Sequence, residues 1–122
     1  MSLLQNKAVH GVGGLILMGG WAFFANRKYE MPEPLIAAIV QGLLTALITL
    51  FLKQIIETIF RSTAGLRRLI LPPLSAFLTS IMLLTSIHST AGTPALLATI
   101  SVPVTVSTLY ALLYTLALSR HA

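Results

Sequence analysis

Apolar residues fill four long stretches of this chain, and short polar segments that contain proline or glycine separate them. An α-helix that crosses the hydrocarbon core of a bilayer needs about 20 predominantly apolar residues, with a lower limit near 17. The pattern therefore predicts an all-α integral membrane protein with four transmembrane helices, arranged as two helical hairpins. The expected spans are residues 8–26, 34–60, 72–88 and 94–120.

Prolines mark the expected starts of three of these helices. Pro34, Pro72 and Pro94 stand at the beginning of apolar stretches, and proline is tolerated in the first turn of a helix but not in its interior. Pro103 falls inside the last helix, where it removes the hydrogen bond to the carbonyl of Thr99 and predicts a kink. That kink is either static or a hinge for alternating access.

A single polar face follows the second predicted helix. Polar residues occupy every fourth position there: Gln41, Thr45, Thr49, Lys53 and Glu57. Residues at this spacing lie on one side of an α-helix. Lipid does not tolerate such residues, so we expect the face to contact protein or to line a wet cavity. Ser101 and Thr105 of the last helix are candidates for the opposite side of the same path.

Two interpretations are open for the residues of that face. Lys53 and Glu57 are spaced for an i,i+4 pair that relays ions or holds an anionic group. Alternatively, both lie at the membrane interface, where the lysine ammonium reaches water. Gln41 lies deeper, and its amide either contacts a substrate or joins two helices through a hydrogen bond.

The first predicted helix is rich in glycine, which lets the backbones of membrane helices approach closely. Gly11 and Gly14 belong to one face of small residues, and Gly20 is a further candidate for close packing. We expect another helix, from this chain or from a partner, to pack against this part of the first helix.

The two outer turns of a compact bundle are expected to lie next to each other. Their polar residues form a candidate rim that attracts anions: Asn26, Arg27, Lys28 and His88. Ordinary solvated turn residues are the alternative. His10 and His88 are expected at opposite faces of the membrane, and the chain has no cysteine or aspartate to complete a metal site. We expect no metal and no cofactor.

Composition supports the membrane assignment. Charged residues make up 9% of the chain and apolar residues 56%, whereas soluble domains have about 25% charged residues. A net charge of +5 would suggest nucleic acid in a soluble protein. Here the basic residues flank apolar segments, where they set topology and contact anionic lipid headgroups. We expect membrane lipids as partners and no nucleic acid.

The distribution of basic residues predicts the orientation in the membrane. The side that carries both termini has five basic residues and no acidic one among them: Lys7, Arg61, Arg67, Arg68 and Arg120. The opposite side has only Arg27 and Lys28. The positive-inside rule then places both termini in the cytoplasm, with the protein in a bacterial-type cytoplasmic (inner) membrane.

The two halves of the chain share a layout of a helix, a short turn that ends in proline, and a longer helix with polar residues. A constant offset aligns Pro34 with Pro94, Ala38 with Ala98, Gln41 with Ser101 and Thr45 with Thr105. Two explanations are open. One is a parallel internal repeat, as in transporters whose site lies at the repeat interface; the other is chance similarity between apolar helices.

These observations favour transport over catalysis. The only carboxylates are Glu30, Glu33 and Glu57, and no Ser–His–acid set can be assembled from them, so we do not expect an enzyme. The first hypothesis is a homo-oligomeric transporter or flippase-like protein whose polar face conducts an anionic or lipid-headgroup substrate. The alternative is a non-catalytic membrane subunit or assembly factor that docks onto a larger membrane complex.

Overall fold

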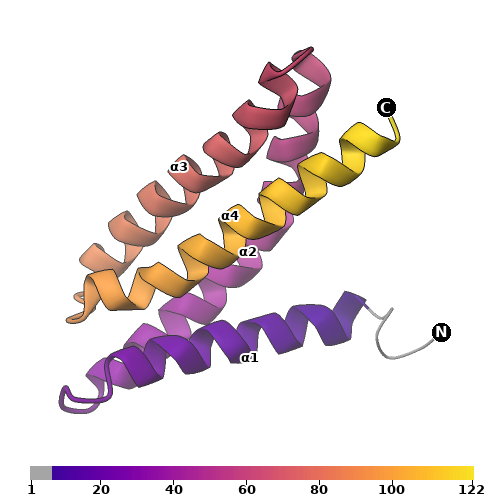
Figure 1. Cartoon of the computed structure of the whole chain (residues 1–122). Coiled ribbons are helices and arrows are strands. Elements are labelled where there is room, and N and C mark those ends of the chain that lie inside the picture. The colour runs from indigo at the N-terminus through magenta and orange to yellow at the C-terminus, as the bar shows by residue number, and fades with distance from the viewer. Residues whose placement is uncertain (1–6) are drawn as a thin grey trace.

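The structure is a computed structural model that describes the backbone of residues 7–122 and the side chains of residues 12–122. The chain forms four α-helices in this range: α1 (Lys7–Ala25), α2 (Glu33–Ser62), α3 (Arg67–Thr90) and α4 (Leu96–Arg120) (Figure 1). The all-α prediction is confirmed for the described residues. Three of the four helices, α2, α3 and α4, are long and apolar enough to cross a membrane.

Helix α1 has a shorter apolar segment than the other three helices. Its apolar part within the described side chains is Val12–Ala25, which falls short of the length that crosses a bilayer. A fourth span therefore stays a prediction. The other helices carry large apolar side chains on their outer surfaces, among them Leu43, Leu50 and Leu97, each more than two-thirds exposed. Such a surface is typical of an integral membrane protein.

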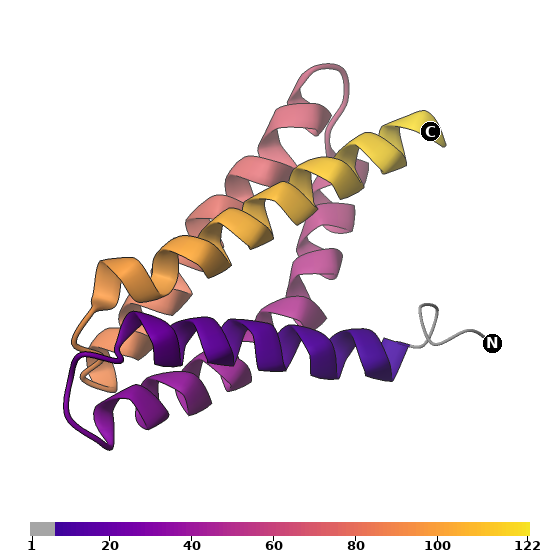
Figure 2. The ribbon, with the colours of Figure 1, turned by 60° about the horizontal axis from the view of Figure 1, so that its bottom comes forward.

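The helices meet closely at one end of the molecule and separate toward the other. The end formed by the turns 26–32 and 91–95 is called the turn end here, and the opposite end, with residues 63–66 and the carboxyl terminus, the connector end. Helix α2 contacts all three other helices, and α1 also contacts α4. Helix α1 ends and helix α4 begins at neighbouring turns, and the two helices diverge toward the connector end (Figures 1 and 2).

The apolar core lies between α2, α3 and α4. Helix α2 contributes Leu44, Ile48, Leu52 and Ile56, which recur every fourth residue and so form one stripe beside the polar face. Small residues such as Ala76 of α3 and Ala111 of α4 are fully buried. Small side chains let membrane helices approach closely, so α3 and α4 pack firmly onto α2.

The predicted start of the third helix is wrong. Pro72 was expected to begin this helix, but α3 begins at Arg67 and contains both Pro72 and Pro73. The fixed φ of proline is itself helical, and each proline removes only one N–H donor. The bonds lost are those to the carbonyls of Arg68 and Leu69, near the start of the helix. The earlier start makes α3 24 residues long, enough for a full span.

Close packing between α1 and α2 occurs at Gly19. A Cβ atom added there would lie 3.1 Å from the carbonyl oxygen of Ala38 on α2. The glycines expected to pack are not in such contacts, since a Cβ atom at Gly14 or Gly20 would meet nothing within 4 Å. Gly11 lies outside the residues whose side-chain surroundings are described. The helix–helix contact is therefore displaced around α1 from its expected position.

Candidate functional site

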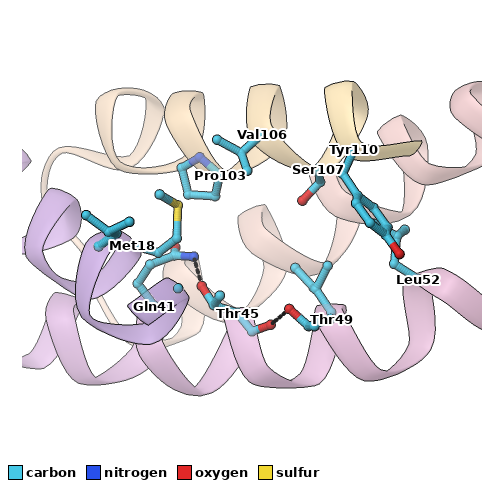
Figure 3. A pocket seen from close by; sticks show the side chains of 12 residues that line it. Met18, Gln41, Thr45, Thr49, Leu52, Pro103, Val106, Ser107 and Tyr110 are labelled. Carbon is cyan, nitrogen blue, oxygen red and sulfur yellow. Dashed lines mark hydrogen bonds between the residues drawn. The ribbon is translucent and has the colours of Figure 1, made fainter. Parts of the chain in front are cut away.

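A cavity of about 300 Å³ lies between α1, α2 and α4 (Figure 3). Five polar side chains line it: Gln41, Thr45 and Thr49 from α2, and Ser107 and Tyr110 from α4. The remaining lining consists of Gly14 and of leucine, isoleucine, valine, methionine and proline side chains. No charged residue is among the lining residues, and most of the wall is apolar.

The polar face of α2 divides between this cavity and the molecular surface. Gln41 is fully buried, and Thr45 and Thr49 also reach the cavity. Lys53, one turn further, is exposed. The structure thus places the amide and hydroxyl half of the face against the cavity and leaves the charged half outside its lining.

The predicted counterparts on α4 are not at the cavity. Ser101 and Thr105 are exposed, and their hydroxyls donate to the carbonyls of Ala98 and Ser101, at 2.8 and 2.7 Å. Ser107 and Tyr110 line the cavity instead. They lie four and seven residues after Pro103, which also lines it, so the three share one face of the helix. The spacing indicates this face, but only packing shows that it faces α2.

Gln41 is held by a chain of hydrogen bonds that links α2 to α3. Its Oε1 lies 2.8 Å from Nε2 of His88, and its Nε2 donates to Thr45 Oγ1 at 3.1 Å. His88 Nδ1 lies 2.7 Å from Thr93 Oγ1. Because an amide oxygen only accepts, His88 carries a proton on Nε2. A neutral His88 then accepts the hydroxyl proton of Thr93 on Nδ1.

His88 is fully buried, which differs from its expected place on a polar rim. The local cause is the end of α3. Gly92 has φ +76°, a left-handed conformation that glycine adopts without steric cost. The amides of Gly92 and Thr93 donate back to the carbonyls of Ser89 and His88, at 3.1 and 2.9 Å, which is a Schellman motif. This motif brings the Thr93 hydroxyl onto the His88 ring.

Asn26 is also fully buried rather than placed at a rim. Its Nδ2 donates to Thr99 Oγ1 at 2.7 Å and to the Ala22 carbonyl at 2.8 Å, and its Oδ1 accepts the Ala95 amide at 2.9 Å. The side chain therefore satisfies a free amide at the start of α4, as a capping residue does. Asn26 joins α1 to α4 at the turn end.

Arg27 and Lys28 are exposed, so the four expected rim residues do not form one group. The Arg27 guanidinium lies over the Phe24 ring, 3.9 Å from its centroid, and donates to the Phe24 carbonyl at 2.8 Å. Two of the predicted rim residues are thus interior contacts that hold the turn end together, and two face outward.

A further contact at the turn end involves Trp21. Its Nε1 donates to the carbonyl oxygens of Ala98 and Thr99 on α4, at 3.0 and 3.2 Å. Pro103 has no N–H to offer the Thr99 carbonyl, and the indole supplies a donor in its place. Asn26 and Trp21 together connect α1 with the first turns of α4, and neither contact was anticipated from residue spacing.

Glu57 lies near the connector end and pairs with residues other than Lys53. The Tyr114 hydroxyl donates to Glu57 Oε2 at 3.0 Å, and Arg61 Nη2 lies 3.9 Å from Glu57 Oε1. Arg61 is largely exposed, and ion pairs of such exposed groups contribute little to stability. The predicted pair of Lys53 with Glu57 is not formed, and the i,i+4 ion pair of Glu57 is with Arg61 instead.

Residues 12–122 contain no group of three or more histidine, cysteine, aspartate or glutamate side chains that could hold a metal ion. The chain matches no known protein family, no curated protein and no solved structure. The cavity and its hydrogen-bond partners are therefore interpreted from their own geometry.

Proposed function

We propose that this protein is a small transporter or flippase-like protein that acts as a homo-oligomer and moves its substrate through the cavity between α1, α2 and α4. The observation that carries the proposal is the position of Gln41, Thr45 and Thr49, which line the cavity between α1, α2 and α4, with Gln41 fully buried and Thr49 exposed at its open side. Polar residues within membrane helices are costly, and they commonly mark the pathways of substrates.

The two ends of the molecule support a one-sided pathway. Hydrogen bonds from Trp21 and Asn26 hold α1 to α4 at the turn end, whereas the same helices diverge toward the connector end (Figure 2). Access from one side at a time is the arrangement that alternating access requires. Opening of the turn end would then complete the transport cycle.

The proposed orientation of the protein in the membrane follows from the positions of its basic residues. Arg61, Arg67, Arg68 and Arg120 belong to segments at the connector end, and the positive-inside rule assigns that end to the cytoplasm. The proposal places the protein in a bacterial-type inner membrane, with four spans in two hairpins and the cavity open to the cytoplasm. The parallel repeat of the two hairpins is part of this proposal.

Transport can be tested with proteoliposomes that contain a fluorescent phosphatidylglycerol, whose inner-leaflet fraction becomes accessible to dithionite only if the protein moves it. We expect the protein to expose this fraction and Gly14→Leu to reduce exposure to the level of protein-free vesicles. Gly14 lines the cavity, and a Cβ atom there meets no neighbour within 4 Å. The leucine side chain should therefore occupy the cavity without a clash between its Cβ atom and the surrounding helices.

Gly20→Leu is the matched control. Gly20 also has open space for a Cβ atom, but it is exposed and outside the cavity lining. Transport should survive this change. Equal loss in both variants, or no lipid movement with the unmodified protein, would contradict a path through the cavity.

The open space beside Gly20 favours a second function. The small-residue surface at Gly20 is uncovered, and such surfaces pack against helices of other chains. A non-catalytic subunit or assembly factor would use it to dock onto a larger complex. Native mass spectrometry of the protein from its host membrane would then show a stoichiometric foreign chain, and Gly20→Leu would remove that chain.

A further inference from the structure

Hydrogen-bond donors without acceptors gather at the cavity. Gln41 is fully buried, and its amide already binds Thr45 and His88, so it is not a donor for a ligand. The Thr45 hydroxyl accepts the bond from Gln41 and donates no hydrogen bond to residues 12–122. Ser107 and Tyr110 line the cavity without making a side-chain hydrogen bond to residues 12–122. The hydroxyls of Thr45 and Ser107 are thus available to one ligand group, whereas Tyr110 lies further along the lining, beside Leu52 (Figure 3).

The other serine and threonine hydroxyls of α4 differ from Ser107. Each of them donates to a main-chain carbonyl of the helix or of its cap: Thr99, Ser101, Thr105, Thr108, Thr115 and Ser119. This back-bonding is the usual way to satisfy a hydroxyl in a membrane helix. Ser107 is the exception on α4, and its hydroxyl points toward α2 across the cavity (Figure 3).

The donors approach from two sides of an uncharged space. Thr45 belongs to α2, and Ser107 belongs to α4. No lysine or arginine lines the cavity to balance an anion, and a charged group in apolar surroundings without a partner is strongly disfavoured. A neutral acceptor meets these donors without that cost, and a carbonyl oxygen, with two lone pairs and no proton, has the matching chemistry.

We propose that the cavity binds the carbonyl group of an uncharged, otherwise apolar part of a membrane molecule, with the hydroxyls of Thr45 and Ser107 as its donors. A cavity of about 300 Å³ is at the small end of ligand sites, so it holds the carbonyl and adjoining carbons. The remainder extends between α1 and α4, where they diverge. Acyl esters of glycerolipids and isoprenoid quinones are two membrane sources of such a carbonyl.

This inference rests on the proposed function, because it names the chemical group that occupies the transport path. It differs from the headgroup recognition expected at first, since the lining would contact the ester or quinone carbonyl and not a phosphate. A phosphate would remain outside the lining, toward the connector end, where Lys53 is exposed.

The test compares two phosphatidylglycerols of equal chain length, one with ester and one with ether linkages, titrated onto delipidated protein and counted by native mass spectrometry. The two lipids share headgroup charge and tails, and only the ester has carbonyls. We expect the ester lipid to bind about 2- to 10-fold more tightly, the effect of about one net hydrogen bond. A second titration with decylubiquinone distinguishes the sources, since displacement of the ester lipid by the quinone assigns the site to quinones.

Substitutions of cavity-lining residues test whether the preference for the ester lipid arises in the cavity. Ser107→Ala alone, and combined with Thr45→Val, should reduce or abolish the ester preference. Thr108→Val is the matched control, because Thr108 is adjacent to Ser107 but lies outside the cavity lining and donates to the Val104 carbonyl at 2.8 Å. It should keep the preference.

Equal binding of ester and ether lipids by the unmodified protein, without quinone binding, overturns the inference, as does a preference that survives both Ser107 variants. The proposed function fails separately. Lipid movement in vesicles without an ester preference removes the carbonyl inference alone, and an ester preference without lipid movement removes the transport function alone.

Discussion

The indole nitrogen of Trp21 lies 3.2 Å from the carbonyl oxygen of Thr99, the carbonyl that Pro103 leaves without a donor from its own helix. An unsatisfied carbonyl within a membrane costs free energy, and neighbouring helices commonly supply the missing donor to proline-containing helices. Trp21 thus both compensates Pro103 and attaches α1 to α4 at the turn end. The contact makes the stability of α4 dependent on α1.

A double-mutant cycle tests this dependence. Trp21→Phe removes the indole N–H while retaining an aromatic ring, and it should lower the free energy of unfolding by about 1–2 kcal/mol. Pro103→Ala restores an N–H that can bind the Thr99 carbonyl. The cost of Trp21→Phe should therefore be smaller in the Pro103→Ala background, as measured by thermal unfolding in detergent. Additive effects of the two changes would show that the residues act independently.

Asn26 should be the most sensitive residue of the first turn. Asn26→Ala removes the bonds to Thr99 and Ala95 and leaves the Ala95 amide without a side-chain acceptor. We expect a loss of about 2–3 kcal/mol of stability, together with faster lipid movement if this contact keeps the turn end closed. Lys28→Ala, at an exposed neighbouring position, should change stability by less than about 0.5 kcal/mol. Similar unfolding midpoints for both variants would argue against the assigned role.

Gln41 and His88 should behave as a coupled pair. Gln41→Leu leaves the Nε2–H of a buried His88 without an acceptor, which should cost about 1–3 kcal/mol. Replacing both residues by leucine removes both polar groups, so the double variant should be more stable than the sum of the single effects implies. The comparison uses unfolding midpoints of the four proteins under one detergent condition. A double variant that shows the full sum would indicate that the 2.8 Å contact contributes no coupling.

Two adjacent glycines of α1 should respond differently to alanine. A Cβ atom at Gly19 would lie 3.1 Å from the Ala38 carbonyl oxygen, so Gly19→Ala should overpack the contact with α2 and cost about 1–3 kcal/mol. Gly20→Ala meets open space and should be neutral or slightly stabilising, because alanine favours the helix over glycine. Thermal unfolding of the two variants side by side decides the matter. A larger loss at Gly20 would mean that another chain covers this surface.

The helices and the polar face of α2 could be predicted from residue order. Hydropathy can be calculated from successive residues alone. Polar residues at every fourth position from Gln41 to Glu57 lie on one face of any α-helix. Pro103 likewise removes the bond to Thr99 wherever α4 lies. The misplaced start of α3 shows the limit of this local reasoning: Pro72 disfavours a helix interior, but its cost is small when it lies within two turns of the helix end.

The composition of the site depended on contacts between segments far apart in the chain. Ser101 and Ser107 are both serines of one apolar helix, and the rotation of α4 about its axis, set by the buried side chains that pack on α2 and α3, brings Ser107 to the cavity. His88 and Asn26 have the polarity of surface residues, yet their partners Gln41 and Thr99 lie 47 and 73 positions away. A buried polar group is stable only with such a partner, and folding alone places the partner beside it.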